Sequence, residues 1–277
     1  MGAPMESYID LHMHSTRSDG SFSPSQVVHR AAELGLSAIS LTDHDSVNGV
    51  AEAQSVGAEV GVEVIAGTEL SAQEENMDVH ILGYFVDPEN SDLLSCLQKF
   101  QDARRERAEK MVAKLNRMGV GVHMAQVLAK AGGGAVGRPH VADVLVEEGF
   151  VFSNDQAFHK YLGYGKPAYQ PKFMLRPSEA VDVIHAAGGL ACLAHPKLYG
   201  KDAMLPGLIE QGLDGIEVLH IKHDNSAVRR YSDLTDQHGL LKTGGSDCHG
   251  DGRGEAVMGK VAVPMAFLDA MKKRLKN

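Results

Sequence analysis

The chain of 277 residues has few cysteines and no long apolar stretch. Its three cysteines, Cys96, Cys192 and Cys248, are far apart and odd in number, so we expect reduced, buried apolar side chains rather than disulfide partners. No apolar run reaches the roughly 18 residues that a membrane span requires. The N-terminus lacks the basic segment and apolar core of a secretion signal. The sequence therefore predicts a cytoplasmic protein with no membrane partner.

Positive charge is also scarce, because 27 Lys and Arg stand against 36 Asp and Glu and the formal net charge is −9. This excess of acid disfavours a general affinity for nucleic-acid backbone, and duplex DNA is not expected as a partner. Bound divalent cations would offset part of the negative charge. The Gly-x-Ser-x-Gly signature of serine hydrolases is absent. The chain does contain 14 histidines, several of them beside Asp, Gly or Pro, and this feature points to its chemistry.

Short apolar runs alternate with amphipathic helical patterns, as in parallel α/β proteins. Ser23 and Pro24, for example, form a typical helix start. A (β/α) barrel is the preferred interpretation, and an open doubly wound sheet is the alternative, because strand count alone does not close a barrel. Seven or so parallel strands are expected, over residues 8–14, 36–44, 63–71, 79–86, 189–195, 215–220 and 240–245, with 260–263 as a further short candidate.

Residues 87–170 interrupt this alternation. They contain no strong strand pattern but a long charged helix, expected over residues 93–118, and shorter helical segments. We therefore expect a barrel formed by residues 1–86 and 171–277. The inserted segment would be a mainly helical lid that selects the substrate.

Histidines and carboxylates follow the ends of several predicted strands. His12 and His14 point the same way, since strand side chains alternate between faces, and they could share one ion. Asp19 follows in a turn sequence, for which an Asx-turn is the ordinary interpretation. His44 closes the second strand within Thr-Asp-His-Asp. Of the acids beside it, Asp45 is interpreted as the cap of the next helix and His44 as the chemically active residue.

The same pattern continues along the chain. Glu69 closes the third predicted strand and His80 begins the fourth. His195 closes the strand after the insertion, and Asp247 and His249 follow the last one on a shared face. Taken singly, such residues are more often solvated carboxylates or hydrogen-bonded core histidines. Their common position at strand ends favours a functional cluster, because functional groups gather at the C-terminal ends of barrel strands.

A mixed set of His, Asp and Glu suits Mn²⁺, Zn²⁺ or Fe²⁺ rather than Mg²⁺ or Ca²⁺, which prefer oxygen ligands. Nine candidate ligands exceed the number that one ion uses. We therefore expect two or three divalent ions, with Mn²⁺ preferred and Zn²⁺ or Fe²⁺ as alternatives. Glu69 is the expected bridge between them.

Four segments resemble the motifs of the polymerase and histidinol phosphatase (PHP) family, and they occur in the family's order. They are Asp-Leu-His-Met-His at 10–14, Thr-Asp-His-Asp at 42–45, Ala-His-Pro at 194–196 and Gly-Ser-Asp-Cys-His at 245–249. The resemblance covers the chain from Tyr8 to about Gly250 and implies a distorted (β/α)₇ TIM-like barrel with up to three metal ions.

The resemblance also implies how the ligands are shared. One ion would be bound by His12, His14, Glu69 and Asp247, a second by Glu69, His80 and His195, and a third by Asp19, His44 and His249. Asp19 and His44 could face the substrate instead. Catalytic roles are expected for Asp19, His44, His195 and Asp247.

Two basic clusters lie in the insertion. Arg104, Arg105 and Arg107 lie on the long helix, and Arg138 and His140 lie at a helix start that could receive an anion. A solvated charged face is the ordinary alternative. Arginine pairs with phosphate in a bidentate way, so two such clusters in an acidic protein favour a phosphate clamp. They also resemble the family branch that removes the 3′-phosphate of nucleoside 3′,5′-bisphosphates, some members of which trim RNA from its 5′ end.

The predicted reaction is hydrolysis of a phosphomonoester by a metal-activated hydroxide. The favoured substrate is a nucleoside 3′,5′-bisphosphate, with pAp converted to AMP and phosphate. Short 5′-phosphorylated RNA, cleaved by a 5′–3′ exoribonuclease, is an alternative. So is histidinol phosphate, although its single phosphate does not explain the basic insertion. A non-catalytic, metal-stabilised PHP interaction module is the non-enzymatic alternative. The sequence leaves the oligomeric state open.

Overall fold

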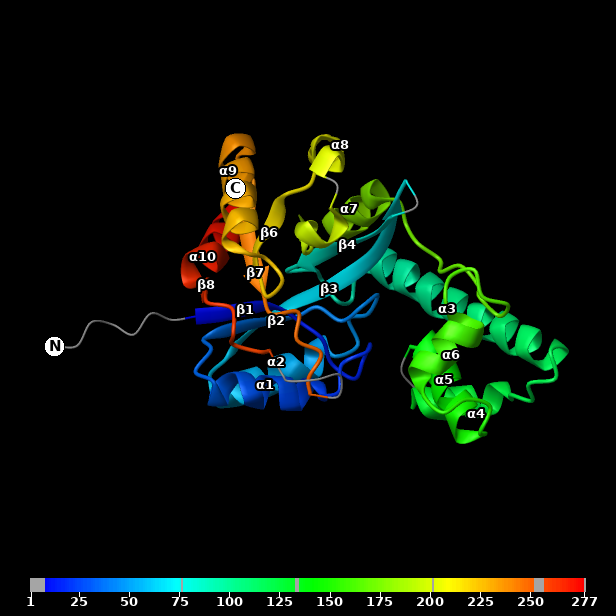
Figure 1. Cartoon of the computed structure of the whole chain (residues 1–277). Coiled ribbons are helices and arrows are strands. Elements are labelled where there is room, and N and C mark those ends of the chain that lie inside the picture. Colours follow the sequence, from blue (N-terminus) through cyan, green and yellow to red (C-terminus); the bar gives the residue numbers. More distant parts are fainter. Residues whose placement is uncertain (1–7, 76, 133–134, 201, 252–256, 277) are drawn as a thin grey trace. The chain divides into compact units, whose positions relative to one another are not determined.

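The computed structural model describes residues 8–75, 77–132, 135–200, 202–251 and 257–276. It divides into two compact units (Figure 1). The first unit comprises Met1–Cys96 and Met174–Asn277, and the second comprises Leu97–Phe173. Within the described residues, no helix is both long and apolar enough to cross a lipid bilayer.

The first unit is built around an eight-stranded sheet with the order β7-β6-β5-β4-β3-β2-β1-β8. The sheet curls so far that the segment after β7 reaches β1, where the Asp247 N–H donates to the His12 carbonyl (2.9 Å) and the His14 N–H donates to the Cys248 carbonyl (2.9 Å). The predicted barrel is confirmed, and it is nearly closed. The open-sheet alternative is wrong. The strands are β1 (Tyr8–Met13), β2 (Ala38–Leu41), β3 (Glu63–Glu74), β4 (Met77–Tyr84), β5 (Leu190–Leu193), β6 (Gly215–His220), β7 (Leu241–Gly245) and β8 (Val263–Pro264).

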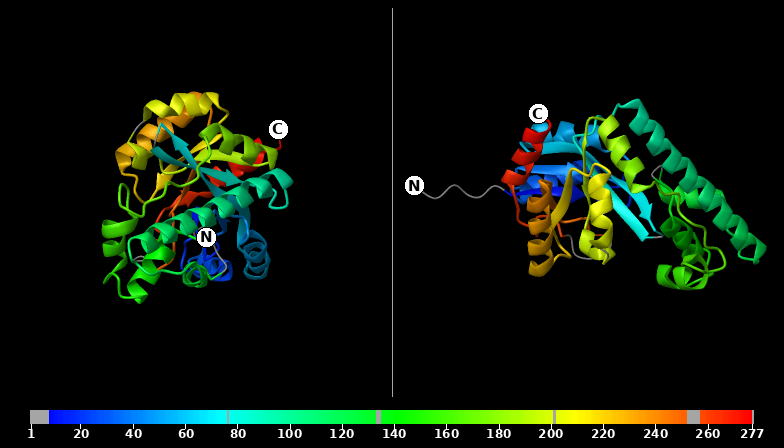
Figure 2. Two further views of the ribbon diagram at one scale, coloured as in Figure 1. Left: turned by 90° about the vertical axis from the view of Figure 1, so that its right-hand side faces the viewer. Right: turned by 90° about the horizontal axis from the view of Figure 1, so that it is seen from above.

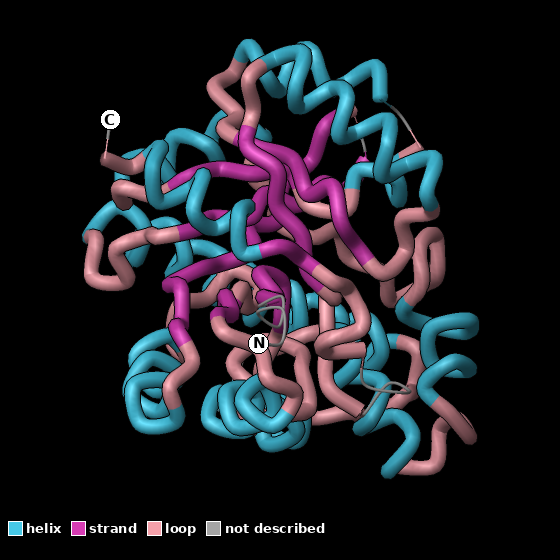
Figure 3. The backbone as a smooth tube through the Cα atoms, turned by 90° about the vertical axis from the view of Figure 1, so that its left-hand side faces the viewer, coloured by secondary structure: helices cyan, strands magenta, loops and turns pink. Residues whose placement is uncertain are grey.

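Helices surround these strands within the first unit (Figure 3). Ser23 begins the first of them as predicted: its hydroxyl accepts from the Gln26 N–H (3.2 Å), the Gln26 side chain accepts from the Ser23 N–H (2.8 Å), and Pro24 fills the first helical position. The unit's helices are α1 (Pro24–Glu33), α2 (Val50–Val60), α7 (Pro177–Ala186), α8 (Leu205–Glu210), α9 (Asn225–His238) and α10 (Met265–Arg274), with short 3₁₀ turns η2 (Pro196–Tyr199) and η3 (Asp202–Met204).

The prediction that all strands are parallel is wrong. β4 runs antiparallel to both β3 and β5, and β8 runs antiparallel to β1. The reason is the short connection from β3 to β4, because a parallel pair needs a crossover of a dozen or more residues. The reversal has a functional consequence, since it places the beginning of β4 at the same rim as the C-terminal ends of the parallel strands. His80 therefore lies opposite Ser71 of β3, on the face that also carries Glu69.

Strand β1 carries both apolar and polar buried side chains. Ile9 and Leu11 pack in an apolar cluster with residues of β4, β5 and α10, whereas Asp10 and His12 are fully buried polar residues. The register of β1 with β2 shifts between Asp10 and Met13, so the side chains do not alternate strictly along this stretch. A second apolar cluster joins β2 to α1 and α2. Cys96, Cys192 and Cys248 are buried thiols, as predicted. The barrel therefore buries a polar interior at one rim, and these side chains form the site described below.

The second unit has its own apolar core, formed by Met111 and Leu115 of α3 with residues of the helices that follow, such as Val127 and Leu145. Figure 2 shows these helices from two further directions. The helices involved are α3 (Ser91–Arg117), which begins in the first unit, then α4 (Met124–Ala131), α5 (Arg138–Glu147), α6 (Asn154–Ala157) and a π-helical turn, η1 (Phe158–Leu162).

Closure of the barrel predicts a strict requirement for glycine at position 245. A Cβ atom there would lie 2.4 Å from both the backbone nitrogen and the Cβ of His12. We expect Gly245→Ala to lower the free energy of unfolding by about 1–3 kcal/mol or more, since backbone must shift to admit the methyl group. Gly207→Ala in α8, where a Cβ meets nothing within 4 Å, is the matched control and should be neutral or stabilising. Urea unfolding measures both, and equal midpoints for the two variants would contradict the prediction.

Candidate metal centre

The two histidines of β1 face two carboxylates at the rim of the barrel. The Nε2 atom of His12 lies 3.4 Å from an oxygen of Glu69 and 3.4 Å from an oxygen of Asp247. The Nε2 atom of His14 lies 3.2 Å from the same two oxygens. The ligand atoms of these four residues all lie within 4.8 Å of one another, so they could hold one ion. This is the group that the sequence predicted for the first ion.

The carboxylate of Glu69 extends the cluster to a second group. Its Oε2 atom, which faces the β1 histidines, lies 3.0 Å from His44 Nδ1, and its Oε1 atom lies 2.9 Å from His80 Nδ1 and 3.1 Å from His195 Nε2. His44, Glu69 and His80 form the compact set of potential ligands here. The expected set had His195 in place of His44. The structure brings His44, His80 and His195 together around the Glu69 carboxylate, whose other contacts are with the β1 histidines.

A third group lies nearer to solvent. The Asp19 carboxylate is 3.2 Å from His249 Nε2 and 4.0 Å from both His44 Nε2 and His14 Nδ1. The side chain of Asp19 is 33% exposed, whereas those of His14 and Glu69 are 0% and 1% exposed. The structure thus adds His14 to the expected set of Asp19, His44 and His249. Of the three groups, this one is the most accessible to a substrate.

The polar atoms of the cluster fit a bound cation. Within the described part of the chain, several buried ring nitrogens lack a hydrogen-bond partner even where a carboxylate oxygen lies 3.0–3.4 Å away, so these atoms are not aligned as hydrogen bonds. They are His12 Nε2, both ring nitrogens of His14, and Nδ1 of His44, His80 and His195. Leaving buried polar atoms without partners costs about 1–3 kcal/mol each. Nitrogen and oxygen donors that converge in this way are the ligands of transition-metal ions.

Electrostatic coupling within the cluster is strong. Burial alone would raise the pKa of Glu69, but the histidines around it, His44 and His80 foremost, hold that pKa well below its usual range. Burial would lower the pKa of His14, yet Asp247 and Glu69 raise it to about 10. His44 is dominated by burial, which lowers its pKa to about 3. Without a cation, the carboxylates are thus neutralised by protons on some of the histidines.

Two buried aspartates that are not predicted ligands hold the loops of the site. Asp43 accepts from the Ser15 N–H (2.7 Å), the Ser15 hydroxyl (2.7 Å) and the Ser18 hydroxyl (2.6 Å), and so anchors the loop that carries Asp19. Asp45 accepts from the N–H and hydroxyl of Ser71 in β3, at 2.7 and 3.0 Å. The interpretation of Asp45 as a helix cap is wrong, because the residue before α2 is Gly49.

Backbone strain also concentrates at this rim. Among the described residues, the five non-glycine positions with positive φ include Asp45 (50°), His195 (29°) and Asp247 (54°). Such conformations are sparsely populated and persist only when the surrounding structure holds them, commonly at functional sites. The ends of the second, fifth and seventh strands are therefore held in defined, strained turns that aim His195 and Asp247 into the cluster.

The site includes two residues of β6 to which the sequence assigned no function. Glu217 is fully buried and contacts His12 and the backbone of His195. His220 ends β6 and is buried. Its Nδ1 accepts from the Lys222 N–H (3.1 Å), so its proton lies on Nε2, 3.5 Å from Asp247 Oδ2. The sequence did contain a signal for Glu217. It is a glutamate in the middle of an apolar strand, and a buried charge at such a position requires a partner.

The basic residues predicted to bind substrate all lie in the second unit, on α3 and α5. Arg105 is 3.4 Å from Glu109, and Arg107 Nε donates to the Gln170 carbonyl (3.0 Å). The Arg138 guanidinium lies over the ring of Phe158, 5.5 Å from its centroid. His140 Nδ1 accepts from the Gly137 N–H (3.1 Å), at the start of α5, and Arg104 lies on α3 one helical turn from Arg107.

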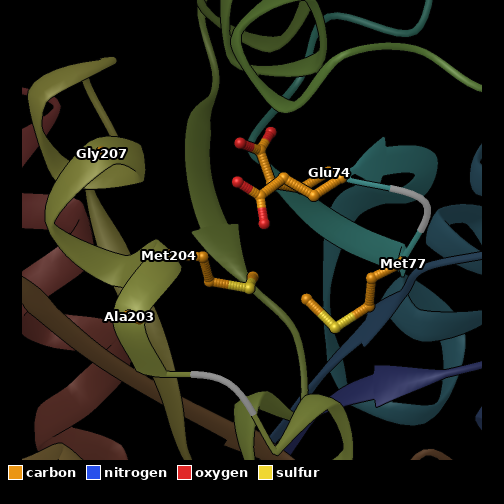
Figure 4. A pocket seen from close by; sticks show the side chains of 6 residues that line it. Glu74, Met77, Ala203, Met204 and Gly207 are labelled. Atoms are coloured by element: carbon orange, nitrogen blue, oxygen red, sulfur yellow. The ribbon is translucent and has the colours of Figure 1, made fainter.

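A separate pocket of about 200 Å³ lies in the first unit, at the tip of the β3–β4 hairpin (Figure 4). The side chains of Met77 and Met204 approach each other across it, beside the carboxylate of Glu74. Among the described residues, none of the predicted site residues lines this pocket. The chemistry expected from the sequence therefore belongs to the histidine and carboxylate cluster.

The chain is similar to known proteins of one family. The profile of the PHP domain matches residues 10–176, more than half of the chain. A Haemophilus influenzae protein named 5′-3′ exoribonuclease is 36% identical over 250 residues, which cover 87% of this chain and 89% of that protein. A Chromobacterium violaceum protein named 3′,5′-nucleoside bisphosphate phosphatase is 35% identical over 252 residues, which cover 89% and 88%.

A solved structure from Bifidobacterium adolescentis, described provisionally as a metal-dependent phosphoesterase, matches with a TM-score of 0.85. Its sequence is 30% identical, and the match covers 99% of this chain and 98% of that one. The similarity therefore extends over both units.

The raised pKa values of the β1 histidines predict that metal binding releases protons. Against the opposing effect of burial, Asp247 and Glu69 raise the pKa of His14 to about 10, and Glu217, Asp247 and Glu69 raise the pKa of His12 well above its usual value, so both shifts favour the protonated ring. A cation needs the neutral ring, so affinity for Mn²⁺ should rise from pH 6 to pH 8 by about tenfold per pH unit for each proton released. Calorimetric titrations in buffers of different ionisation enthalpy count these protons. An affinity independent of pH in this range would contradict the prediction.

Proposed function

Since the chain belongs to the PHP family and is a metal-dependent phosphoesterase, we propose that it removes the 3′-phosphate from nucleoside 3′,5′-bisphosphates, converting pAp to AMP and phosphate. The observation that carries this proposal is the convergence of nine histidine and carboxylate side chains into three adjoining groups at one barrel rim. The C. violaceum relative, named for this activity, supports the choice of substrate.

We propose that the cluster binds two or three divalent ions, preferably Mn²⁺. Glu69 would bridge the first two positions, because its two oxygens face different histidines. His12, His14 and Asp247 would complete the first position, His80 and His195 the second, and Asp19, His44 and His249 the third. Bound divalent ions supply an activated water and neutralise charge on the phosphoryl oxygens.

The chain's own residues would then position the phosphate. His195 and Asp247 are the proposed catalytic residues of the two buried positions, where strained turns hold them in place. Asp19 and His44, the more exposed members of the cluster, are proposed to contact the substrate at the third position. Holding the reacting phosphate against fixed groups lowers the barrier by converting a bimolecular encounter into a positioned one.

The second unit is the proposed binding element for the non-reacting phosphate. Residues 97–173 carry 12 Lys and Arg against 7 Asp and Glu, a net charge of +5, whereas the rest of the chain carries 15 against 29, or −14. A basic unit in an acidic protein suits an anionic ligand. The residues proposed for this role are Arg104, Arg105, Arg107, Arg138 and His140.

Exonucleolytic cleavage of short 5′-phosphorylated RNA is the second candidate. The H. influenzae relative carries that activity in its name, and the same cluster and basic unit would suit a phosphodiester substrate. Histidinol phosphate remains less favoured because its single phosphate gives the basic unit no role.

Phosphate release is expected from adenosine 3′,5′-bisphosphate when the protein is loaded with Mn²⁺, and little release is expected from histidinol phosphate. A malachite-green assay measures both, and chromatography of a 5′-phosphorylated oligonucleotide tests the exonuclease. Release from histidinol phosphate alone would overturn the proposed substrate. Loss of mononucleotides from the RNA at the higher kcat/KM would make the second candidate the principal activity.

Replacement of the bridging carboxylate should abolish turnover. Glu69→Gln keeps the shape of the side chain but removes the charge that two candidate ion positions share. We expect kcat to fall at least about 100-fold, because metal-ion catalysis contributes several kcal/mol. Glu74→Gln, near the end of the same strand, is the matched control and should retain activity. A fully active Glu69→Gln enzyme would contradict the proposed bridge.

A substitution in the second unit is expected to change KM rather than kcat. Arg105 is 62% exposed on α3, and Arg105→Ala should raise KM for the bisphosphate about tenfold while kcat changes little, as for loss of a charged hydrogen bond. Lys110→Ala removes a similarly exposed cation from the same helix and serves as the control. Equal KM values for both variants would argue against a role for Arg105.

A further inference from the structure

Glu217 contacts two candidate ligands of the site although β6 contributes none of the nine predicted ligands. Its side chain is fully buried. One carboxylate oxygen lies 3.0 Å from His12 Nδ1, and the other accepts a 2.7 Å hydrogen bond from the His195 N–H. A single carboxylate therefore contacts two candidate ligands that come from β1 and from the end of β5.

The first contact determines which ring nitrogen of His12 is available. A carboxylate only accepts hydrogen bonds, so the proton of the neutral ring must lie on Nδ1. The lone pair is then on Nε2, the atom that faces Glu69 and Asp247 at 3.4 Å. A partner that fixes the tautomer in this way also fixes the orientation of the ring toward a cation.

The second contact holds a strained backbone. His195 adopts φ 29° and ψ 53° and directly precedes Pro196, although residues before proline prefer extended conformations. The hydrogen bond to Glu217 fixes the His195 N–H at this turn, and the ring then reaches the Glu69 carboxylate at 3.1 Å. The strain is maintained by a contact that is itself buried and charge-assisted.

From these contacts we infer that Glu217 is a positioning residue, which sets the tautomer of His12 and the backbone of His195 and thereby couples the two buried ion positions. The inference rests on the proposed metal binding, but it is independent of which phosphoester the enzyme hydrolyses. Loss of such an outer partner typically weakens metal binding by about 10- to 100-fold.

The chain contains a matched control between the same two strands. Asp214, which precedes β6, accepts from the Ala191 N–H of β5 (2.8 Å) and contacts His185 Nε2 (2.7 Å). Like Glu217, it contacts a histidine ring and accepts from a backbone N–H, but the N–H lies within β5 and not after its C-terminal end. Asp214→Asn should change stability without changing metal affinity.

The experiment compares Mn²⁺ affinity of the full-length wild type, Glu217→Gln and Asp214→Asn by calorimetry, with circular dichroism to establish that each is folded. The two N–H groups contact different oxygens of Glu217, and glutamine replaces one of these oxygens with an NH₂ group that cannot accept a hydrogen bond. We expect Glu217→Gln to bind Mn²⁺ about 10- to 100-fold more weakly and Asp214→Asn to match the wild type. Equal Mn²⁺ affinities of all three proteins would overturn the inference about Glu217 but not the proposed function. Absence of Mn²⁺ binding by the wild type would overturn the proposed function together with it.

A measurement on the wild type covers the case in which Glu217→Gln does not fold. Nitrogen-15 NMR of the protein with Zn²⁺, a diamagnetic ion, reports the tautomer of each histidine. We expect the His12 signal of a ring protonated at Nδ1 and coordinated through Nε2. Coordination through Nδ1 would overturn the inference, because Glu217 would then have no proton to accept from that ring.

Discussion

One buried carboxylate, that of Glu69, organises the functional rim of this protein. It lies among imidazole rings with its side chain 1% exposed, and its two oxygens face different histidines. An isolated buried carboxylate is costly, so it must be compensated by protons on neighbouring rings or by cations. The ring nitrogens around Glu69 face a common centre. They cannot all form well-aligned hydrogen bonds there, and several of them have no hydrogen-bond partner among the described residues.

Around this centre, the barrel uses buried acids of a second kind as structural anchors. Asp43 fixes the loop before Asp19, Asp45 ties the second strand's end to β3, and Glu217 holds His12 and His195. Each of these carboxylates accepts from N–H or hydroxyl groups and so contributes order. The buried acids of the barrel therefore have two different roles: some anchor loops and strands, and others face the cluster.

Charge is divided between the two units in a way that the whole-chain value hides. The net charge of −9 combines an acidic barrel unit with a second unit of net charge +5. In the first unit several acidic residues contact histidines, whereas the second unit carries an excess of Arg and Lys. An anionic substrate is compatible with both features, because divalent cations reverse the local sign of an acidic site.

The helix start at Ser23 and the buried cysteines could be predicted from the sequence, because they depend on local periodicity and on side-chain chemistry. The barrel was the preferred interpretation over an open sheet, and its type and the sharing of the candidate ligands were implied by the resemblance of four motifs to the PHP family. Only the tertiary structure decided that β4 runs antiparallel and brings His80 to the rim, that His44 rather than His195 completes the compact group with Glu69 and His80, and that Asp45 anchors a strand. It also decided the role of Glu217, which meets His12 across 205 residues of chain. Such pairings follow from strand direction and barrel closure, and no local pattern of residues encodes them.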